Sequence, residues 1–169
     1  MAARRARSSS GARAWPGAAS AHSAQASEAI NSSKTTIGTA FESLNFVTIP
    51  YNGDDGWPHV SRRGSTQVFG PQQMAIWVRK RDDGLSKAVE TRPEVTLFYL
   101  DVIERGVAYT FYGRGHVSTD PDVADQVFAA SPEPEQAQDP DRKGVPLIIA
   151  LERVVAAGHK AENNFVMTR

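Results

Sequence analysis

Short runs of β-forming residues, separated at close intervals by Gly, Pro and Asn, fill most of this 169-residue chain after residue 45. They predict six or seven strands, at residues 46–49, 59–69, 74–78, 95–102, 107–118, 145–155 and 164–167. The connections leave little room for long crossovers, and no Gly-rich turn opens a helix, so a doubly wound parallel sheet is disfavoured. The pattern predicts a mostly antiparallel β-barrel.

Residue types assign the individual turns and strands. Pro50 is expected to end the first strand, and residues 52–56 (NGDDG) carry hairpin-turn chemistry because Gly and Asn tolerate positive φ. The second strand is expected to form a hairpin with the third, at 74–78. The run at 95–102 (VTLFYLDV) is almost continuously apolar, which is typical of a strand buried on both faces.

Helical spacing of apolar residues predicts three short helices, at residues 35–44, 82–91 and 121–130. Asp82 or Asp83 is expected to cap the second helix and Pro93 to end it, while Thr119 or Asp120 caps the third. The Pro- and acid-rich segment after the third helix, up to residue 143, is expected to be a loop or a short polar helix. The expected fold class is therefore α+β, mostly β with short helices.

Composition excludes several kinds of site and partner. The chain has no cysteine, which rules out disulfides, thiolate metal sites and a cysteine nucleophile. No apolar run approaches the ~20 residues of a membrane-spanning helix, so we expect a soluble, cytoplasmic protein. Without the four arginines of residues 1–27, the chain has 15 basic and 19 acidic residues, whereas a nucleic-acid-binding domain is normally basic. We therefore expect neither a membrane nor a nucleic acid as a partner.

Residues 1–33 differ from the rest of the chain. Ala, Ser, Arg and Gly dominate them, and such a segment buries too little apolar surface to offset its ordering entropy. An Arg- and Ser-rich, acid-poor start also resembles an organellar transit peptide, whereas the apolar stretch of a secretory signal is missing. Composition favours a disordered or flexible extension at 1–33, followed by one domain at 34–169.

Six cations gather around the third predicted strand, the helix after it and the predicted partner strand. They are Arg62, Arg63, Arg79, Lys80, Arg81 and Lys87. Such a concentration is unfavourable unless an anion binds there, and a phosphate suits Arg forks. The Ser86 hydroxyl and the N–H groups of the helix start are further donors. The alternative is a solvated charged edge with Asp82, Asp83 and Glu90 as counter-charges, and residue chemistry alone leaves both open.

Other chemistries receive less support from the residues. Trp77, inside the cation cluster, could stack on a flat heteroaromatic ring, although a Trp in a strand is more often core. The four histidines form no His-x-His or His-x-x-x-His pair, which argues against zinc, while a single His remains a possible axial haem ligand. No Gly-x-Ser-x-Gly turn points to a hydrolytic triad. A predicted anion site without an identifiable set of catalytic residues fits a protein in which a bound cofactor carries out the chemistry.

Five sequence pieces, in their order and spacing, resemble the pyridoxamine 5'-phosphate oxidase-like family. They are residues 56–61 (GWPHVS), 74–79 (MAIWVR), 86–87 (SK), 92–99 (RPEVTLFY) and 113–117 (GRGHV). The FVM of residues 165–167 also resembles the chain end of small members. The resemblance covers roughly residues 36–169.

The resemblance implies a split β-barrel homodimer with FMN at the dimer interface. It also implies an oxidoreductase that transfers hydride through the flavin to a small-molecule substrate. Basic and hydroxyl residues of the second strand, the third strand and the following helix would hold the phosphate. The matching positions are Ser61, Arg62, Arg63, Trp77, Val78, Arg79, Ser86 and Lys87. Residue chemistry and resemblance thus converge on the same segments, which favours a phosphate site.

One motif departs from the family pattern. Many members carry a basic pair eight or nine residues before the proline that matches Pro93, where this chain has Leu85 and Gly84. The cations that could take over the phosphate are Arg79, Lys80 and Arg81. Relatives that use deazaflavin F420 or haem keep two alternatives open, an F420-dependent reductase and a non-catalytic flavin or haem carrier or sensor. Residues that bind pyridoxamine phosphate in the true oxidases are not evident, so that activity is not assigned.

Overall fold

The computed structural model describes residue 32 and residues 35–82, 84–158 and 164–168. The strands are β1 (Val47–Asn52), β2 (Pro58–Arg63), β3 (Gln67–Gly70), β4 (Gln73–Val78), β5 (Glu94–Asp101), β6 (Val107–Val117), β7 (Val145–Gly158) and β8 (Phe165–Thr168). The helices are α2 (Leu85–Thr91), α3 (Pro121–Ala129) and α4 (Glu133–Gln136). Residues 35–38 are also helical and continue as turns to residue 44. The extension expected at residues 1–33 lies, apart from Ser32, outside the described residues.

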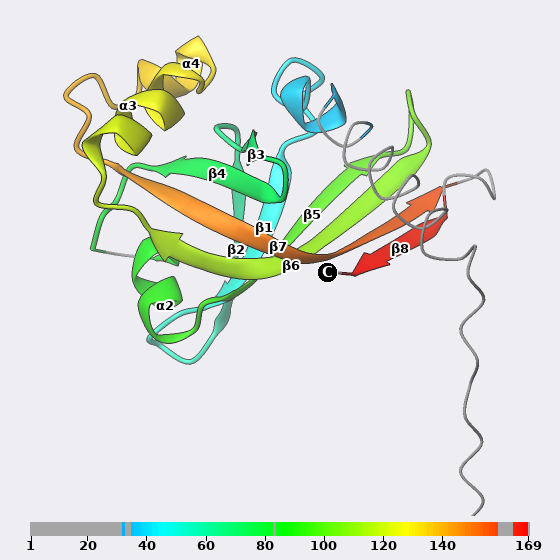
Figure 1. Cartoon of the computed structure of the whole chain (residues 1–169), viewed down its shortest axis with the longest axis horizontal. Helices are drawn as coiled ribbons and strands as arrows, with labels where there is room; N and C mark the ends of the chain where they lie inside the picture. Colours follow the sequence, from blue (N-terminus) through cyan, green and yellow to red (C-terminus); the bar gives the residue numbers. More distant parts are fainter. Residues whose placement is uncertain (1–31, 33–34, 83, 159–163, 169) are drawn as a thin grey trace, which may run out of the picture.

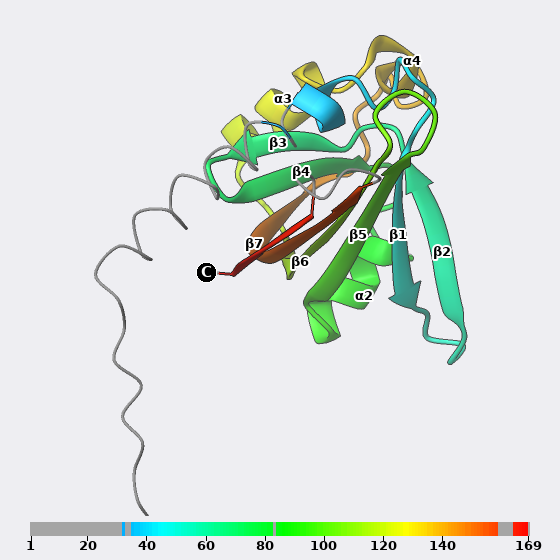
Figure 2. The same ribbon diagram turned by 90° about the vertical axis from the view of Figure 1, so that its right-hand side faces the viewer.

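All eight strands belong to one sheet, in which every neighbouring pair is antiparallel. The strand order is β2-β1-β5-β6-β7-β4-β3, and this order does not close into a ring. β8 pairs with the second half of β7, on the same edge that β4 occupies along the first half. The bent sheet holds the β1–β2 hairpin on one side and the β3–β4 pair on the other (Figures 1 and 2). The prediction of a mostly antiparallel, split barrel with short helices is confirmed. Among the described residues, no helix has the length and apolar character needed to cross a membrane.

The second predicted strand, at residues 59–69, is wrong as a single element. The chain leaves the sheet after β2 and re-enters it as β3, so β2 pairs with β1 while β3 pairs with β4. Two hydroxyl groups hold the connection: Thr66 Oγ1 donates to the Arg63 carbonyl at 3.0 Å, and buried Ser65 donates to the Trp77 carbonyl at 3.0 Å. The expected hairpin between the strand of Arg62 and Arg63 and the third strand therefore does not exist.

The first strand continues through Pro50, contrary to the expectation that Pro50 ends it. Proline lacks an N–H and is tolerated where a strand has no further neighbour to bond. The pairing of β1 with β5 is limited to Thr48 opposite Phe98, so β1 has already separated from β5 at Pro50. Beyond this point a pocket of about 180 Å³ opens between the two strands and α2, with Leu85 and Val89 among its lining residues.

Two hydrophobic clusters hold the sheet together. The larger one fills the concave face with alternate residues of β1, β4, β5, β6 and β7, and α2 adds Leu85 and Val89. The smaller one lies between α3 and the opposite face of β4 and β7, where Trp77 packs edge-on against Phe128 at a centroid distance of 5.1 Å. Because α3 covers that face, β4 and the first half of β7 are buried on both sides, which explains their continuous apolar sequence.

The strand β5 is buried on one face only, which corrects the expectation of burial on both. Val95, Leu97 and Tyr99 belong to the core, whereas Phe98 and Leu100 are 37% and 47% exposed. Register continues this apolar face across the sheet: Phe98 lies opposite Thr110, Thr110 opposite Val155, and Val155 opposite Val166 of β8. We call the exposed side chains of Phe98, Leu100 and Val166, together with half-buried Val155 between them, the outer apolar face.

The N-cap residues predicted from the sequence agree with the structure for α3 but not for α2. Asp120 caps α3 and accepts a hydrogen bond from the N–H of Asp122 at 2.9 Å, as predicted. The N-cap of α2 is Gly84 instead of Asp82, with a positive φ of 60° and no side-chain cap bond, while Asp83 lies outside the described residues. A positive φ is a backbone conformation that glycine adopts without strain.

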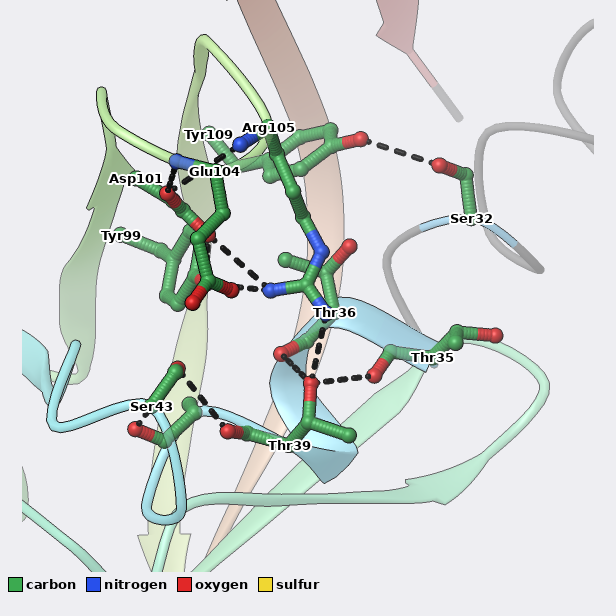
Figure 3. Close-up of polar contacts among 11 residues, drawn as sticks. Ser32, Thr35, Thr36, Thr39, Ser43, Tyr99, Asp101, Glu104, Arg105 and Tyr109 are labelled. Atoms are coloured by element: carbon green, nitrogen blue, oxygen red, sulfur yellow. Dashed lines mark hydrogen bonds and ion pairs between the residues drawn. The ribbon is translucent and has the colours of Figure 1, made fainter.

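A buried polar network joins the segment at 35–44 to the turn between β5 and β6 (Figure 3). Asp101, 1% exposed, accepts from the backbone N–H groups of Glu104 and Arg105 at 3.0 and 3.3 Å and pairs with the Arg105 guanidinium at 3.0 Å. Arg105 also donates to the Thr39 hydroxyl at 2.9 Å and to the Tyr99 hydroxyl at 3.3 Å. This network fixes the helical turn over one end of the barrel.

Candidate anion and cofactor site

The inner face of β2 carries three functional side chains at alternate positions. His59, Ser61 and Arg63 are half-buried, whereas Val60 and Arg62 between them are exposed. Successive side chains of a strand point to opposite faces, so residues two apart share one face. We call His59, Ser61 and Arg63 the inner stripe of β2.

Arg63 is the cation of this stripe and it is bonded to a neutral group. Its Nε donates to the Ser61 hydroxyl at 3.2 Å. Burial lowers the pKa of Arg63, and the positive charge of Arg79 lowers it further, while Tyr51 and Glu135 act in the opposite direction. No acidic side chain of the described residues forms an ion pair with Arg63. A half-buried guanidinium with a second one nearby and no carboxylate in contact suits an anion.

Arg62 lies on the opposite side of the same strand. Its Nη2 donates to the Leu44 carbonyl at 3.3 Å, and its guanidinium carbon stands 4.9 Å from the centre of the Phe46 ring. The sequence-predicted set treated Arg62 and Arg63 alike, but the structure separates them.

The end of β4 contributes both core and surface residues to the predicted set. The side chains of Trp77 and Val78 lie in the two hydrophobic clusters, and Trp77 Nε1 donates to buried Asp139 at 2.8 Å. After the strand ends, Arg79 and Lys80 are exposed, and Arg79 is hydrogen-bonded to the Gln138 amide. Of these four residues, only the two cations present charged groups at the surface.

Two residues of α2 complete the predicted set, and both have partners. Ser86 is fully buried and donates to the Lys80 carbonyl at 2.6 Å. Lys87 Nζ lies 3.1 Å from Oδ2 of Asp54 in the β1–β2 turn, with both side chains more than half exposed. An anion that recruits Lys87 therefore has to compete with Asp54.

A cavity of about 270 Å³ separates the β1–β2 turn from α2. Its lining residues are Tyr51, Gly53, Asp54, Asp55, His59, Asp82, Gly84, Lys87 and Ala88. One end of the inner stripe, His59, therefore faces a cavity that is partly open to solvent, and Lys87 lines the same cavity from α2.

Sequence reasoning missed the pair formed by His59 and Asp55. The His59 Nε2 atom lies 3.0 Å from Oδ1 and 3.1 Å from Oδ2 of Asp55. The hydrogen bond from His59 is the main cause that lowers the pKa of Asp55, followed by the N–H of Trp57. The four-residue separation across a predicted hairpin turn was the available signal, because such a turn returns the chain beside itself.

Metal ligation finds no support in the described part of the chain, where no three His, Cys, Asp or Glu side chains cluster suitably. The site thus consists of a stripe with one half-buried guanidinium, which leads to a cavity lined by a carboxylate-bound imidazole. Such an arrangement can hold a phosphate at one end and exchange a proton at the other.

Solved structures share this fold at low sequence identity. No family model and no curated protein sequence matches the chain. A protein related to general stress protein 26, of the pyridoxinephosphate oxidase family, from Clostridium acetobutylicum matches with a TM-score of 0.57 at 14% identity, over 75% of this chain and 87% of that one. The general stress protein 26 of Bacillus anthracis matches with 0.59 at 11% identity, over 80% and 98%. The chain has the pyridoxamine 5'-phosphate oxidase-like split-barrel fold.

A split barrel of this type also occurs under a different description. A NimC/NimA family protein from Clostridium acetobutylicum matches with a TM-score of 0.64 at 12% identity, over 88% of this chain and 98% of that chain. The fold is thus established across almost the full length of these proteins, while their descriptions differ. What this chain does has to be argued from its own site.

Proposed function

We propose that this protein is an FMN-binding oxidoreductase that holds the FMN phosphate at Arg63. The observation that carries the proposal is the half-buried Arg63 guanidinium, bonded to Ser61 and close enough to Arg79 for the two charges to interact. A phosphate monoester offers several acceptor oxygens and two negative charges, which suits two guanidinium forks. Bound FMN would supply hydride chemistry, which none of the residues offers by itself.

The residues of this chain anchor and orient the cofactor. Arg63 and Ser61 hold the phosphate from β2, Arg79 and Lys80 approach from the end of β4, and Lys87 approaches from α2. The contribution of the protein is therefore electrostatic at the phosphate and steric along the inner stripe.

We also propose that the protein is a homodimer, with the outer apolar face as the interface. Phe98, Leu100 and Val166 are each more than a third exposed on one continuous sheet surface. The almost continuously apolar sequence of β5 is typical of a strand covered on both sides, yet one chain covers only one side. A second copy of the same surface supplies the missing cover, as in a two-fold symmetric interface.

The alternatives are an F420-dependent reductase and a non-catalytic flavin or haem carrier or sensor. The absorbance spectrum of the purified protein separates them, because bound flavin and bound haem have distinct visible bands. A protein that neither is yellow nor binds added FMN contradicts the proposal: a haem band then favours the haem carrier or sensor, and the absence of both bands favours F420 or no cofactor. Flavin retention without turnover by any hydride donor favours the carrier.

The phosphate site is tested by comparing FMN with riboflavin, which lacks the phosphate. Arg63→Ala should weaken FMN binding by about 10- to 100-fold, the value of a hydrogen bond to a charged group, and leave riboflavin binding unchanged. Arg79→Ala and Lys87→Ala should act in the same direction. Fluorescence titration measures both affinities.

The neighbouring Arg62→Ala is the matched control, because Arg62 points to the other face of β2. Its FMN affinity should stay close to that of the unmodified protein. Equal losses in the two variants would place the anion elsewhere and contradict the role of Arg63.

A further inference from the structure

His59 is held in place by contacts from two directions. Its Nε2 lies 3.0 and 3.1 Å from the two oxygens of Asp55, which also accepts from the N–H of Trp57 at 3.1 Å. The ring of Tyr51 stacks against the imidazole with a centroid distance of 5.3 Å and an angle of 17° between the planes. The imidazole therefore has a defined position although its side chain is 42% exposed.

The β1–β2 turn is shaped to admit this pair. A Cβ atom at Gly53 would lie 2.5 Å from His59 Nε2 and 2.7 Å from Asp55 Oδ1. Only glycine leaves room there for the imidazole and the carboxylate to meet without a shift of the turn.

The pairing with Asp55 determines which ring nitrogen is available. An ionised carboxylate can only accept, so the shared proton belongs to Nε2 of the imidazole. This leaves Nδ1 as the second ring nitrogen, and no described residue is hydrogen-bonded to it. The imidazole lines the cavity of about 270 Å³ next to α2. A ring fixed by a carboxylate at one nitrogen is arranged to transfer protons at the other.

The spacing along β2 relates this pair to the anion site. His59 and Arg63 share the inner stripe, and a separation of four residues corresponds to about 13 Å between their Cα atoms along a strand. The Arg63 side chain turns back as far as Ser61, to which its Nε is bonded, and so lies nearer to His59 than its Cα does. An elongated ligand with its phosphate at Arg63 can therefore extend along the stripe and bring its other end, or a second molecule bound beside it, to His59.

We propose that His59, positioned by Asp55, is the proton-transfer residue of this site. The inference rests on the proposed FMN-dependent reaction, in which the reduced flavin supplies the electrons. When an acceptor such as a quinone is reduced to the quinol, it takes up two electrons and two protons, of which bound FMN would supply both electrons and one proton as a hydride. The second proton comes from protonated His59: its Nδ1–H bond breaks as an O–H bond forms on the acceptor, and solvent returns a proton to the ring. His59 gives no electrons, and Asp55 acts only through His59.

Other charged and titratable groups face the same cavity. They are Tyr51 on β1, Asp54 in the turn, Asp82 before α2 and Lys87 on α2. Asp82 is the useful comparison, because it lines the cavity and carries the same charge as Asp55 but forms no ion pair within the described residues. Its replacement changes the local field without touching the imidazole.

The first experiment compares two electron acceptors in the FMN-loaded protein. The flavin is reduced anaerobically with dithionite and mixed either with menadione, which takes up protons on reduction, or with ferricyanide, which takes up none. His59→Gln should slow flavin reoxidation by menadione about 100-fold, and Asp55→Asn about 10-fold, with the ferricyanide rates unchanged. Asp82→Asn should leave both rates as they are. Equal slowing with both acceptors, or no slowing with menadione, overturns the proposal.

The second experiment asks whether a bound ligand contacts His59. Diethyl pyrocarbonate modifies accessible imidazoles, and peptide mass spectrometry resolves each histidine. FMN should slow modification of His59 several-fold and leave exposed His116 of β6 unchanged. Unprotected His59 in a protein that retains FMN overturns the role of His59 alone. Absence of FMN binding instead overturns the proposed function, and this role with it.

Discussion

At the scale of single residues, Asp101 shows how a carboxylate is kept charged inside the barrel. Burial opposes its ionisation, but two backbone N–H groups and the Arg105 guanidinium outweigh burial and hold the pKa of Asp101 below 3.8. The same guanidinium reaches Thr39, so the charge also anchors the segment at 35–44 (Figure 3). One buried ion pair thus connects three parts of the chain.

We expect Asp101→Asn to lower the free energy of unfolding by about 2–3 kcal/mol. The substitution leaves a half-buried Arg105 without its counter-charge and replaces Oδ2, the acceptor of the guanidinium, by an amide N–H₂, while Oδ1 can still accept from the two backbone N–H groups. Urea denaturation followed by circular dichroism measures the change. Asp141→Asn is the control, because its ion pair with Lys143 is exposed and should contribute nothing measurable. Equal loss in both variants contradicts a special role for Asp101.

The same residue predicts a pH dependence of stability. A pKa that is lower in the folded state than the usual 3.8 means that the unfolded state binds the proton more tightly. The contribution of Asp101 is therefore complete above the unfolded pKa and is lost as the pH falls through the folded one. The difference in unfolding free energy between the unmodified protein and Asp101→Asn should shrink below about pH 4. A difference that stays constant down to pH 2 contradicts this assignment.

At the scale of elements, the β1–β2 hairpin and α2 are joined across the cavity by Asp54 and Lys87. If Lys87 binds the FMN phosphate, the Asp54 carboxylate competes with that phosphate for Lys87. Asp54→Asn should then tighten FMN binding by a few-fold, because an exposed ion pair is worth at most about 1 kcal/mol. Titration of FMN fluorescence measures the gain.

The double variant separates competition from a general change in charge. In the Lys87→Ala background, Asp54→Asn should give no further gain in FMN affinity, because the contested partner is absent. An undiminished gain in that background means that Asp54 acts through its field alone.

Sequence patterns predicted most elements of the sheet but not their neighbours. Alternation and turn residues located β1, β4, β6, β7 and β8, because these signals are local. The break between β2 and β3 was missed because Gly64, Ser65 and Thr66 can equally occur within a strand, and the hydroxyl bonds that turn the chain are made to distant residues. Which strand lies beside which depends on such long-range contacts.

The candidate site could likewise be predicted only in part, because its geometry depends on contacts between distant residues. The sequence located the cations, since charge is visible in the residue types, and it named both Arg62 and Arg63. Only the start of β2 at Pro58 decides that Arg63 faces inward with Ser61 while Arg62 faces outward. The pair of His59 and Asp55 needed the turn geometry around Gly53, which residue types suggest but do not specify.

At the scale of the whole molecule, the outer apolar face determines what the chain does with a second copy of itself. Leu100→Glu should convert the proposed dimer into a monomer, because a buried unpaired carboxylate at an apolar interface is strongly unfavourable. Light scattering measures the mass.

A matched acidic substitution elsewhere serves as the control. Ala129→Glu places the same charge on the exposed end of α3, which covers the other face of β4 and β7. It should leave both the mass and FMN binding unchanged. A monomeric unmodified protein, or a dimer that survives Leu100→Glu, contradicts the proposed interface.

The single residue pair between β1 and β5 has a consequence for how the molecule opens. Eight consecutive residue pairs form the ladder between β5 and β6, whereas the ladder between β1 and β5 contains one, Thr48 opposite Phe98, and core packing of Val47 and Ile49 supplies the other contacts of β1. Because few backbone hydrogen bonds cross this boundary, we expect local opening to begin at the β1–β2 hairpin while β5, β6 and β7 stay folded. The residues that would hold a phosphate and move a proton are therefore carried by the part of the protein whose amide hydrogens should exchange earliest. A ligand that bridges Arg63 and α2 would slow this exchange and so stabilise the hairpin against local unfolding.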